Sequence, residues 1–403
     1  MTVQTTSNLT SAIRTKYHAK YVEAMEMQRL YDQLATPADQ LYDAEANDFM
    51  GSTETFNFLS DMAPGTSAIS QTSDITPQVL VDATNTVTPT SRGDAIQWAE
   101  TIEIMAYTNY GASSHAKVGK AAMESVELLA EAAALQGTMA ISTVARADLD
   151  HDTSTHLFTD AAIWKAASMI PSLKCPPYFG NGRAQWLALG HTDLNYDLIE
   201  NNNILAIAEY QDKEILFTGE IGQLANFKIV FSPWAKVFGG AGADGDSNVN
   251  TTTSAALARL AATMTVAAGT NMVTNQWLTI GTEETGSTFY PTNERVRTKS
   301  DYTAASTTVT FVGEGANGGL RFAHDSGVAV RNADNVYPVA YGSPRSLVKV
   351  YSREIGPYPI LIGPKVDGIL NQFKTLGYKW HGNYGRITEA HIIRGEYACS
   401  LQA

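Results

Sequence analysis

Residues 51–108 constrain the fold most, because they form a long stretch with few large apolar side chains. The stretch is rich in Thr, Ser, Gly and Pro. Two pieces within it have an extended pattern: residues 53–59, and a half-buried strand in which Ile96, Trp98, Ile102 and Ile104 alternate with polar or small residues. We predict a long hairpin between these two pieces, with a polar tip that contains Pro77 and Pro89. Because a lone two-stranded hairpin is marginal in water, this one requires another surface to lie on.

A long amphipathic helix follows this stretch. Its apolar residues recur at spacings of four and three, the pattern of one buried helix face: Val118, Ala122, Val126, Leu129 and Ala133. Ser113 or Ser114 is placed to cap its start, and Gly137 stands where a C-terminal cap is expected. At about 1.5 Å per residue the helix would be roughly 35 Å long. We therefore predict a spine helix that is longer than most globular helices.

Residues 9–35 also have a helical pattern. The apolar positions recur mostly every four residues, at Ile13, Tyr17, Tyr21, Met25, Leu30 and Leu34, and Pro37 stops the pattern. Two interpretations stay open: an ordinary surface helix, or an arm that packs on a neighbouring molecule.

The remaining sequence alternates between two kinds of pattern. Residues 160–238 alternate helices and strands, with a buried strand at 186–190 and a strand pair at 215–222 and 227–231. A Gly-rich segment at 239–246 then introduces short β-type runs at 264–267, 276–280 and 308–312, separated by turn signals. The α/β pattern resumes at 336–339, and residues 389–398 form a strand near the end. We predict a mixed α/β domain with an inserted small β domain.

Composition limits the classes of function. Of the 403 residues, 44% are apolar but only 17% are charged, which suits a surface that is covered by neighbours. The 28 Lys and Arg face 41 Asp and Glu, giving a net charge of −13, so tight, direct DNA binding is not expected. Two cysteines, Cys175 and Cys399, indicate buried thiols in a reducing cytoplasm rather than a disulfide framework. The start lacks the apolar core of a signal peptide, and no stretch is long enough for a membrane span.

One cluster has the residue types of a metal site. Asp148, Asp150, His151 and Asp152 are followed by His156. Their spacing matches neither an EF-hand loop nor the zinc pattern HExxH, so a solvated loop after the spine helix is the favoured interpretation. A metal-dependent hydrolase that uses Asp148, Asp150, His151 and His156 stays as an alternative.

Other motifs lack the context that their chemistry requires. Residues 114–121 resemble a phosphate-binding loop but have Ser at the first Gly position and Ala after the Lys. The Gly-rich residues 314–319 lie between β runs, and residues 342–346 lack the pattern of a nucleophile elbow. His191 and Asp193 follow a strand and are expected to cap the next helix rather than to act as acid and base. We predict no catalytic residue, no cofactor-binding residue and no metal ligand, and therefore no enzyme and no cofactor.

The order of these parts resembles the tailed-phage capsid fold of the Hong Kong 97 type (HK97-like), in the branch of N4-type podophages. The motifs are AsnTyrGly at 109–111, GlyThr at 137–138, the segments 219–230 and 235–242, and Asp367, Leu370, Gln372, Gly377, Tyr378 and Lys379. They cover most of the chain outside residues 1–50 and 243–333. The resemblance implies an α+β fold with these parts: an N-terminal arm at 1–50, an extended loop at 51–108, the spine helix and peripheral domain at 109–159, an axial α/β domain at 160–242 and 334–380, the inserted β domain at 243–333, and a C-terminal strand of the peripheral domain at 381–403.

The resemblance also implies a function. A member of this family would be a major capsid protein, assembled in the host bacterial cytoplasm as pentamers and hexamers into an icosahedral shell around double-stranded DNA. Its partners would be further copies of itself, with scaffolding, portal and cement proteins. No Lys occurs between Lys20 and Lys117, so we expect none of the isopeptide cross-links that weld some shells of this type. Plausible contact residues are Tyr17, Tyr21, Arg92 and Glu103.

Two further alternatives stay open. The chain could form an encapsulin-like cellular nanocompartment with the same fold, or it could be a tail or host-binding structural protein.

Overall fold

The structure is a computed structural model of the chain. It describes residues 31–37, 53–59, 62, 64–65, 77, 79, 82–105, 110–180, 183–200, 223–224, 226–243, 249–343, 346–352, 355–367, 372–386 and 388–402. Two compact units are distinguished and are described separately. Unit 1 comprises residues 1–27, 36–126 and 348–387, and unit 2 comprises residues 28–35, 127–347 and 388–403.

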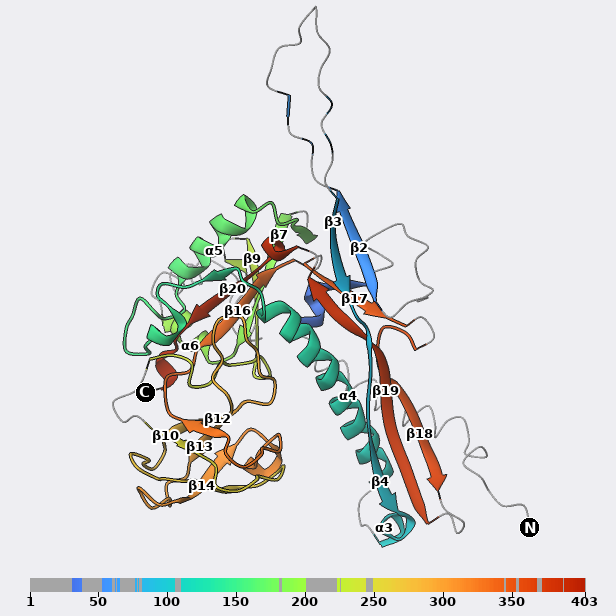
Figure 1. The fold of residues 1–403 in the computed structure, drawn as a ribbon, viewed down its shortest axis with the longest axis vertical. Coiled ribbons are helices and arrows are strands. Elements are labelled where there is room, and N and C mark those ends of the chain that lie inside the picture. Colours follow the sequence, from blue (N-terminus) through green and yellow to red (C-terminus); the bar gives the residue numbers. More distant parts are fainter. Residues whose placement is uncertain are drawn as a thin grey trace, which may run out of the picture. The chain divides into compact units, whose positions relative to one another are not determined.

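The spine helix is present as α4, Tyr110–Leu135, which contributes to both units (Figure 1). Val118, Ala122 and Val126 of the predicted stripe are buried. Further along, the buried positions are Ala130 and Ala134, while Leu129 and Ala133 are only half-buried. Gly137 lies two residues beyond the helix end but does not adopt the left-handed conformation of a glycine cap. The predicted helix is therefore confirmed, with its buried face rotated by one position in the last two turns. Its start is earlier than predicted, because Ser113 and Ser114 lie inside the helix and do not cap it.

Unit 1 contains a sheet whose strands come from both ends of the sequence. Its strands are β1 (Ala35–Pro37), β4 (Thr90–Ala99), β17 (Leu347–Tyr351), β18 (Ile360–Asp367) and β19 (Phe373–Arg386), of which β1 and β17 each begin with a residue of unit 2. β4 pairs antiparallel with β19 over ten residues, and β18 pairs with the other edge of β19. These three strands run side by side in Figure 1.

The hairpin differs from its prediction in its second strand. β2 (Glu54–Leu59) pairs with β3 (Asp82–Val87), not with the strand that contains Ile96 and Trp98. That strand is β4; it ends at Ala99, where the Glu100 N–H donates to the Gln372 carbonyl at 2.8 Å. Residues 100–105, predicted to continue the strand, form helix α3 (Glu100–Met105). Most of the predicted tip lies outside the described residues.

Residues 31–37 correct the prediction for the first helix. Residues 9–30 lie outside the described residues, but Tyr31–Leu34 form a 3-10 helix and Ala35–Pro37 form β1. Tyr31 and Leu34 are fully buried, and the Glu127 carboxylate of α4 accepts the backbone N–H groups of Tyr31 and Asp32. The buried side chains and the carboxylate partner favour a short turn over a continuous helix at this point.

Unit 2 contains a mixed seven-stranded sheet. The strands are β5 (Ala140–Ile141), β6 (Tyr178–Gly180), β7 (Arg183–His191), β8 (Gln223–Leu224), β9 (Phe227–Ser232), β16 (Tyr337–Gly342) and β20 (Ile392–Tyr397). The order is β5-β20-β16-β7-β9-β8, and β6 pairs with β7. β7 and β9 run parallel, while β16 is antiparallel to both of its neighbours. The strands predicted at 186–190, 227–231 and 336–339 are confirmed, and residues 215–222 lie outside the described residues.

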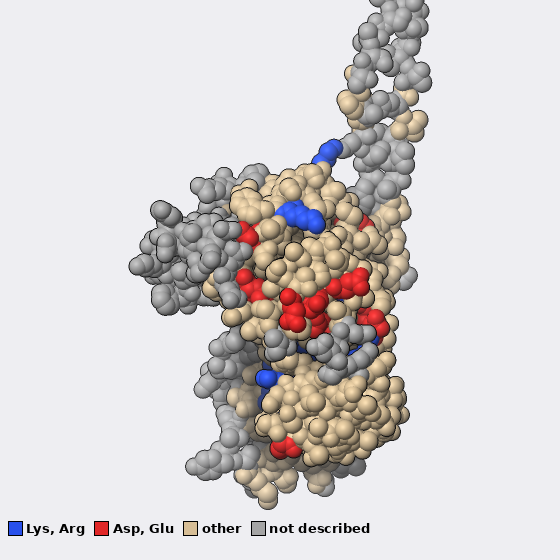
Figure 2. Space-filling view, turned by 90° about the vertical axis from the view of Figure 1, so that its left-hand side faces the viewer, with Lys and Arg blue, Asp and Glu red and all other residues tan. Residues whose placement is uncertain are grey.

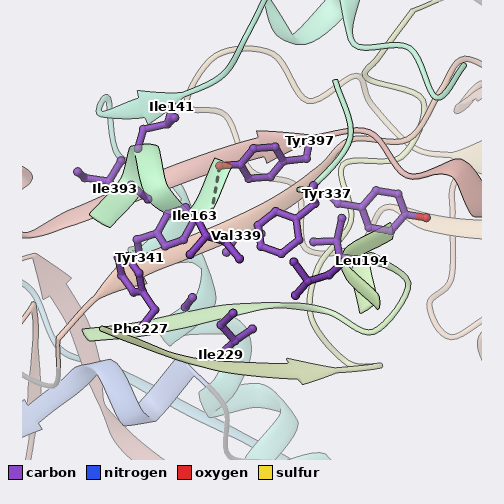
Figure 3. Packing of buried hydrophobic residues seen from close by; sticks show 14 of the residues in the cluster. Ile141, Ile163, Leu194, Phe227, Ile229, Tyr337, Val339, Tyr341, Ile393 and Tyr397 are labelled. Carbon is purple, nitrogen blue, oxygen red and sulfur yellow. Dashed lines mark hydrogen bonds between the residues drawn. The ribbon is translucent and has the colours of Figure 1, made fainter. Parts of the chain in front are cut away.

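A cluster of buried side chains holds this sheet to its helices. Helix α5 spans Asp160–Ser172 and α6 spans Leu194–Glu200. Figure 3 shows side chains from α5, α6, β9, β16 and β20 directed toward one another. The hydroxyl oxygens of Tyr341 and Tyr397 lie 3.1 Å apart within this apolar cluster. The two polar groups therefore satisfy each other in the core.

A second sheet in unit 2 is entirely antiparallel. Its six strands are β10 (Asn250–Thr252), β11 (Thr263–Thr265), β12 (Trp277–Ile280), β13 (Glu294–Thr298), β14 (Thr308–Gly313) and β15 (Ala329–Arg331). The order is β10-β15-β12-β13-β14-β11, and the sheet has a buried cluster of its own. The β runs predicted at 276–280 and 308–312 coincide with β12 and β14. Short 3-10 helices outside this sheet or in its loops are Arg146–Asp148, Ala316–Gly318, Glu389–His391 and Ser400–Gln402.

The end of the chain is divided differently from the prediction. Residues 334–380 were expected in the α/β domain, but residues 348–387 belong to unit 1, through the pairing of β19 with β4. The last strand was expected in one domain with residues 109–159. It is β20, which pairs with β5 of that range along one edge and with β16 of the seven-stranded sheet along the other.

Candidate functional site

The fold brings only two of the four residues of the possible metal site together, Asp150 and His151, and adds Asp334. Asp150, His151 and Asp334 offer ligand atoms within 4.8 Å of one another. His151 Nδ1 lies 3.0 Å from both carboxylate oxygens of Asp334, whose Oδ2 also accepts the His151 backbone N–H. His156 instead accepts the Asp150 N–H, and Asp148 is not part of the group.

This arrangement anchors a loop. Burial acts to lower the pKa of His151, but the hydrogen bond and the charge of Asp334 outweigh it and raise the pKa. Leu149, between the acidic residues, is fully buried, and its carbonyl accepts the Ala243 N–H at 2.9 Å. The loop is thus held by its neighbours rather than merely solvated, which corrects the prediction in part.

Asp193 has a different role from the predicted helix cap. Although it directly precedes α6, its Oδ2 accepts the Tyr337 hydroxyl at 2.9 Å and lies 3.4 Å from Arg295 Nη1. Arg295 Nη1 also donates to the Tyr337 hydroxyl oxygen at 2.9 Å. Burial acts to raise the pKa of Asp193, but the hydrogen bond from His191, with the charges of His191 and Arg295, holds it well below its usual range. Asp193 therefore binds β13 of the second sheet to β16 of the first.

The two cysteines are core residues. Both are free and buried, and both belong to the cluster beneath the seven-stranded sheet. Cys175 Sγ lies 3.2 Å from the His391 carbonyl, and burial raises the pKa of both thiols. The prediction of buried thiols is confirmed.

The remaining motifs lie in structural positions. Residues 114–121 are within α4, and residues 314–319 form the loop after β14. Ser346, in the 342–346 motif, donates its hydroxyl to the His391 carbonyl at 2.7 Å and accepts the Ser343 N–H. Arg92 lies exposed on β4, Glu103 lies in α3, and Tyr17 and Tyr21 lie outside the described residues.

A buried group of charges, which sequence reasoning missed, joins the two sheets of unit 2. Arg146 Nε donates to Glu396 at 3.0 Å, and Arg394 Nε donates to the same carboxylate at 2.6 Å. Both guanidinium groups also donate to the Gly286 carbonyl, and Arg146 donates to the Glu284 carbonyl at 2.7 Å. The loop between β12 and β13 is thereby fixed to β20.

A lysine fixes the same loop from a second direction. Lys236 Nζ donates to the carbonyls of Tyr290 and Asn293, both at 2.9 Å, and lies 3.6 Å from the Glu284 carboxylate. Its backbone N–H donates to Glu131 of α4 at 2.5 Å. Burial raises the pKa of Glu131 to about 7, although the Lys236 N–H and ammonium act to lower it.

The sheet of unit 1 has one covered face and one bare face. Opposite residues of an antiparallel pair share a face, so Trp98, Leu376 and Tyr378 lie on one side of β4 and β19. This side packs on α4. The rings of Trp98 and Tyr110 are in contact, with centroids 5.7 Å apart, and the side chains of Tyr378 and Ser125 form a hydrogen bond.

The other side of this sheet carries three large exposed apolar residues. Ile360, Ile362 and Phe373 are 38%, 44% and 45% exposed, and the register places all three on the face opposite α4. Beside Ile362, a groove of about 600 Å³ runs over Gly93, Ala95 and Gly377. No described residue of unit 1 fills it. We define this side of β4, β18 and β19 as the bare face.

None of the described helices combines the length and apolar character that a membrane span requires.

Comparisons with known proteins give likenesses to phage capsids. No protein-family model matches the chain, and no curated protein matches it. The structure of the capsid of Ralstonia phage GP4 resembles this chain with a TM-score of 0.49 and 9% sequence identity, and the match covers 88% of this chain and 86% of that chain. The capsid of the cyanophage P-SCSP1u has a TM-score of 0.49 and 12% identity, over 86% and 83%. The capsid of the cyanophage Pam1 has a TM-score of 0.49 and 12% identity, over 88% and 87%.

Proposed function

We propose that the chain is a structural protein, the major capsid protein of a tailed bacteriophage, and not an enzyme. In this proposal, copies assemble as pentamers and hexamers into an icosahedral shell that encloses double-stranded DNA. Residues 1–50 are the arm, residues 51–108 the extended loop, and the β10–β15 sheet the inserted domain of the HK97-like fold. The N4-type motifs of the sequence support the branch.

The observation that carries the proposal is the bare face of unit 1. Large apolar residues on an exposed sheet face beside a groove indicate a surface to which another molecule binds. Here Ile360, Ile362 and Phe373 share one face with the groove over Gly93 and Gly377. The residues of β4 on this face, Ser91, Gly93, Ala95 and Gln97, are exposed as well. A face of this kind gains stability when the surface of another molecule covers it.

Charge supports the enclosure of DNA without tight binding. The net charge of −13 repels a polyanion, so a wall made of this chain would store a genome rather than hold it in place. Scaffolding, portal and cement proteins are the further partners of such a shell. Assembly would take place in the cytoplasm of the host bacterium, before the shell becomes part of the virion.

The first test is electron microscopy of the full chain expressed alone, after a sizing column. We expect closed shells or rings of subunits. A chain that stays a discrete monomer even when it is expressed with scaffold and portal would contradict the proposal and would favour a tail protein.

A paired variant tests the bare face itself. Ile362→Thr with Phe373→Thr keeps two strand-compatible side chains but removes apolar area. Each side chain is already more than half covered in the free chain, so complete coverage in the assembly adds about half of the ~1.5–3 kcal/mol of a fully buried side chain. The loss of each one therefore weakens a contact by about 0.7–1.5 kcal/mol, roughly 3- to 10-fold. We expect more free subunit with an unchanged melting temperature. Val144→Thr with Val273→Thr is the matched control, since both are exposed apolar residues of unit 2. Equal assembly of the two variants would exclude the bare face as a contact.

A further inference from the structure

The exposed side of the six-stranded sheet contains a groove with a specific chemistry. Along β13, Val296 points into the buried cluster, so Arg297 points to the other side. Trp277 of β12 and Val312 of β14 are the direct cross-strand neighbours of Arg297. These three residues and Lys299 line a groove of about 640 Å³. An aromatic side chain, two cations and an apolar side chain thus share one surface.

Arg297 and Lys299, two of the cations that line the groove, are available to bind an acidic partner. Arg297 Nε donates to the Asn275 carbonyl at 3.0 Å, and its guanidinium carbon lies 5.7 Å from the centre of the Trp277 ring. These contacts fix the side chain but leave its two terminal nitrogens without an acceptor among the described residues. Lys299 likewise has no ion pair within the described part of the chain. A carboxylate ligand fits two nitrogens of an Arg in a bidentate pair.

The acids at the rim of this groove are already engaged. Glu314 lies 3.5 Å from Arg295, and Asp301 accepts the Thr310 hydroxyl at 3.4 Å. Val312 is 50% exposed beside the cations. The groove therefore fits a segment that brings two acidic side chains.

The chain itself has such a segment on another part of unit 2. Figure 2 shows Asp and Glu side chains gathered on one face of the molecule, with few Lys or Arg among them. In the loop at 148–152, acidic residues stand at alternate positions. Asp148 is exposed with no side-chain partner among the described residues, and Asp152 is 81% exposed, with only His151 near it at 3.4 Å. The two exposed acids of this loop therefore offer a pair of negative charges to the pair of positive charges on Arg297 and Lys299.

We propose that the groove of Trp277, Arg297, Lys299 and Val312 binds the acidic loop 148–152 of a second copy of this chain. The contact rests on the proposed function, because it requires many copies side by side. Groove and loop are different patches of one unit, so each copy would use both, in a head-to-tail contact. Contacts of this kind close into rings when the rotation between copies permits.

Charge reversal in the full chain tests the contact. Arg297→Glu with Lys299→Glu gives a groove variant, and Asp148→Lys with Asp152→Lys gives a loop variant. Because like charges at an interface are repulsive, each variant alone should show at least ten-fold weaker association by light scattering and fewer shells by electron microscopy. A mixture of the two variants restores opposite charges at each contact between unlike copies and should recover the association measured by light scattering.

The control and the outcomes separate this contact from the proposed function. Arg259→Glu with Lys165→Glu makes the same change of charge at exposed sites of unit 2 outside the groove, and should assemble as the unmodified chain does. If the mixture does not recover association by light scattering, or if the groove variant assembles normally, the contact does not exist. If only the groove variant is impaired, the groove binds a different acidic partner, and the second-copy contact is overturned.

Two further readouts keep this test decisive. The melting temperatures of the variants should equal that of the control; if the reversal unfolds the groove variant, Arg297→Gln with Lys299→Gln removes the charges without repulsion and should still weaken association. If the unmodified chain forms no shells even with scaffold and portal, the proposed function fails first, and the result is distinct from normal shells made by the groove variant.

Discussion

Glu396 is a buried carboxylate of unit 2 that pairs with two arginines. Its carboxylate forms ion pairs with Arg146 and Arg394, and the side chains of all three residues are at most 8% exposed. Burial lowers the pKa of Arg394, and the charge of Glu396 acts against this. Glu396→Gln keeps the shape but removes the negative charge that the two buried cations share. Removing one partner of a buried ion pair typically costs about 3–5 kcal/mol.

This loss can be measured by thermal unfolding of the full chain. For a unit of about 245 residues, each kcal/mol lowers the melting temperature by about 2–4 °C, so the expected decrease is about 6–20 °C. Unfolding in urea at constant pH gives the free energy directly.

A matched substitution in the same unit separates burial from charge. Glu283 pairs with Arg331 at 2.7 Å, but its side chain is 49% exposed. An exposed pair contributes up to about 1 kcal/mol, so Glu283→Gln should change the stability little. If Glu396→Gln and Glu283→Gln lower the free energy of unfolding equally, the buried charges do not hold the two sheets together, and the reasoning is refuted.

Three other predictions concern protons, thiols and cross-links. The carboxyl of Glu131 has a pKa of about 7 in the folded chain and of 4.5 in the unfolded chain, so the folded chain keeps this proton to higher pH. The free energy of unfolding should therefore fall by roughly 3 kcal/mol as the pH rises from 4.5 to 7. Glu131→Gln should flatten the pH dependence measured by urea unfolding. Cys175 and Cys399 are buried with raised pKa values, so a thiol reagent should label neither until denaturant is added, and fast labelling of the native chain would contradict their burial. Boiled particles should run on a denaturing gel as single subunits, since no Lys lies between Lys20 and Lys117; a ladder of multiples would refute this.

Local periodicity was sufficient to predict individual elements. The stripe of Val118, Ala122 and Val126 gave α4 because a helix satisfies its backbone within itself, and its pattern is complete in a short window. The buried runs at β7 and β9 were predicted for the same reason. The end of α4 was less accurate, since neighbouring segments decide which residues are covered there.

Pairing between distant strands could not be predicted from the same patterns. The alternation at Ile96 and Trp98 indicates a strand with one buried face, but it does not specify the partner. That partner is β19, more than 270 residues later, and its pairing with β4 also moves residues 348–387 out of the predicted α/β domain. The nearer candidate, β2, pairs with β3 instead.

The charged contacts of unit 2 were missed for a related reason. Asp193 was noticed beside His191, but its partners Arg295 and Tyr337 are 102 and 144 residues away. One local signal existed: β13 reads GluArgValArgThr, an unusually charged strand within a β-rich segment. Charges in a strand with a buried face require partners, and such a run is therefore a place to look for contacts between sheets.

The low charge content and the buried charges together explain why this surface requires neighbours. Only 17% of the residues are charged, and several of these, including Glu131, Lys236, Arg295, Arg394 and Glu396, lie buried between the sheets of unit 2. Charges used in the interior fix how the strands meet, but they do not keep the exterior soluble. The apolar side chains of Ile362 and Phe373 then remain on a surface with little charge to keep molecules apart. Such a surface leads to aggregation unless contacts of defined geometry cover it first, and paired charges such as those of the groove and the acidic loop would provide that geometry.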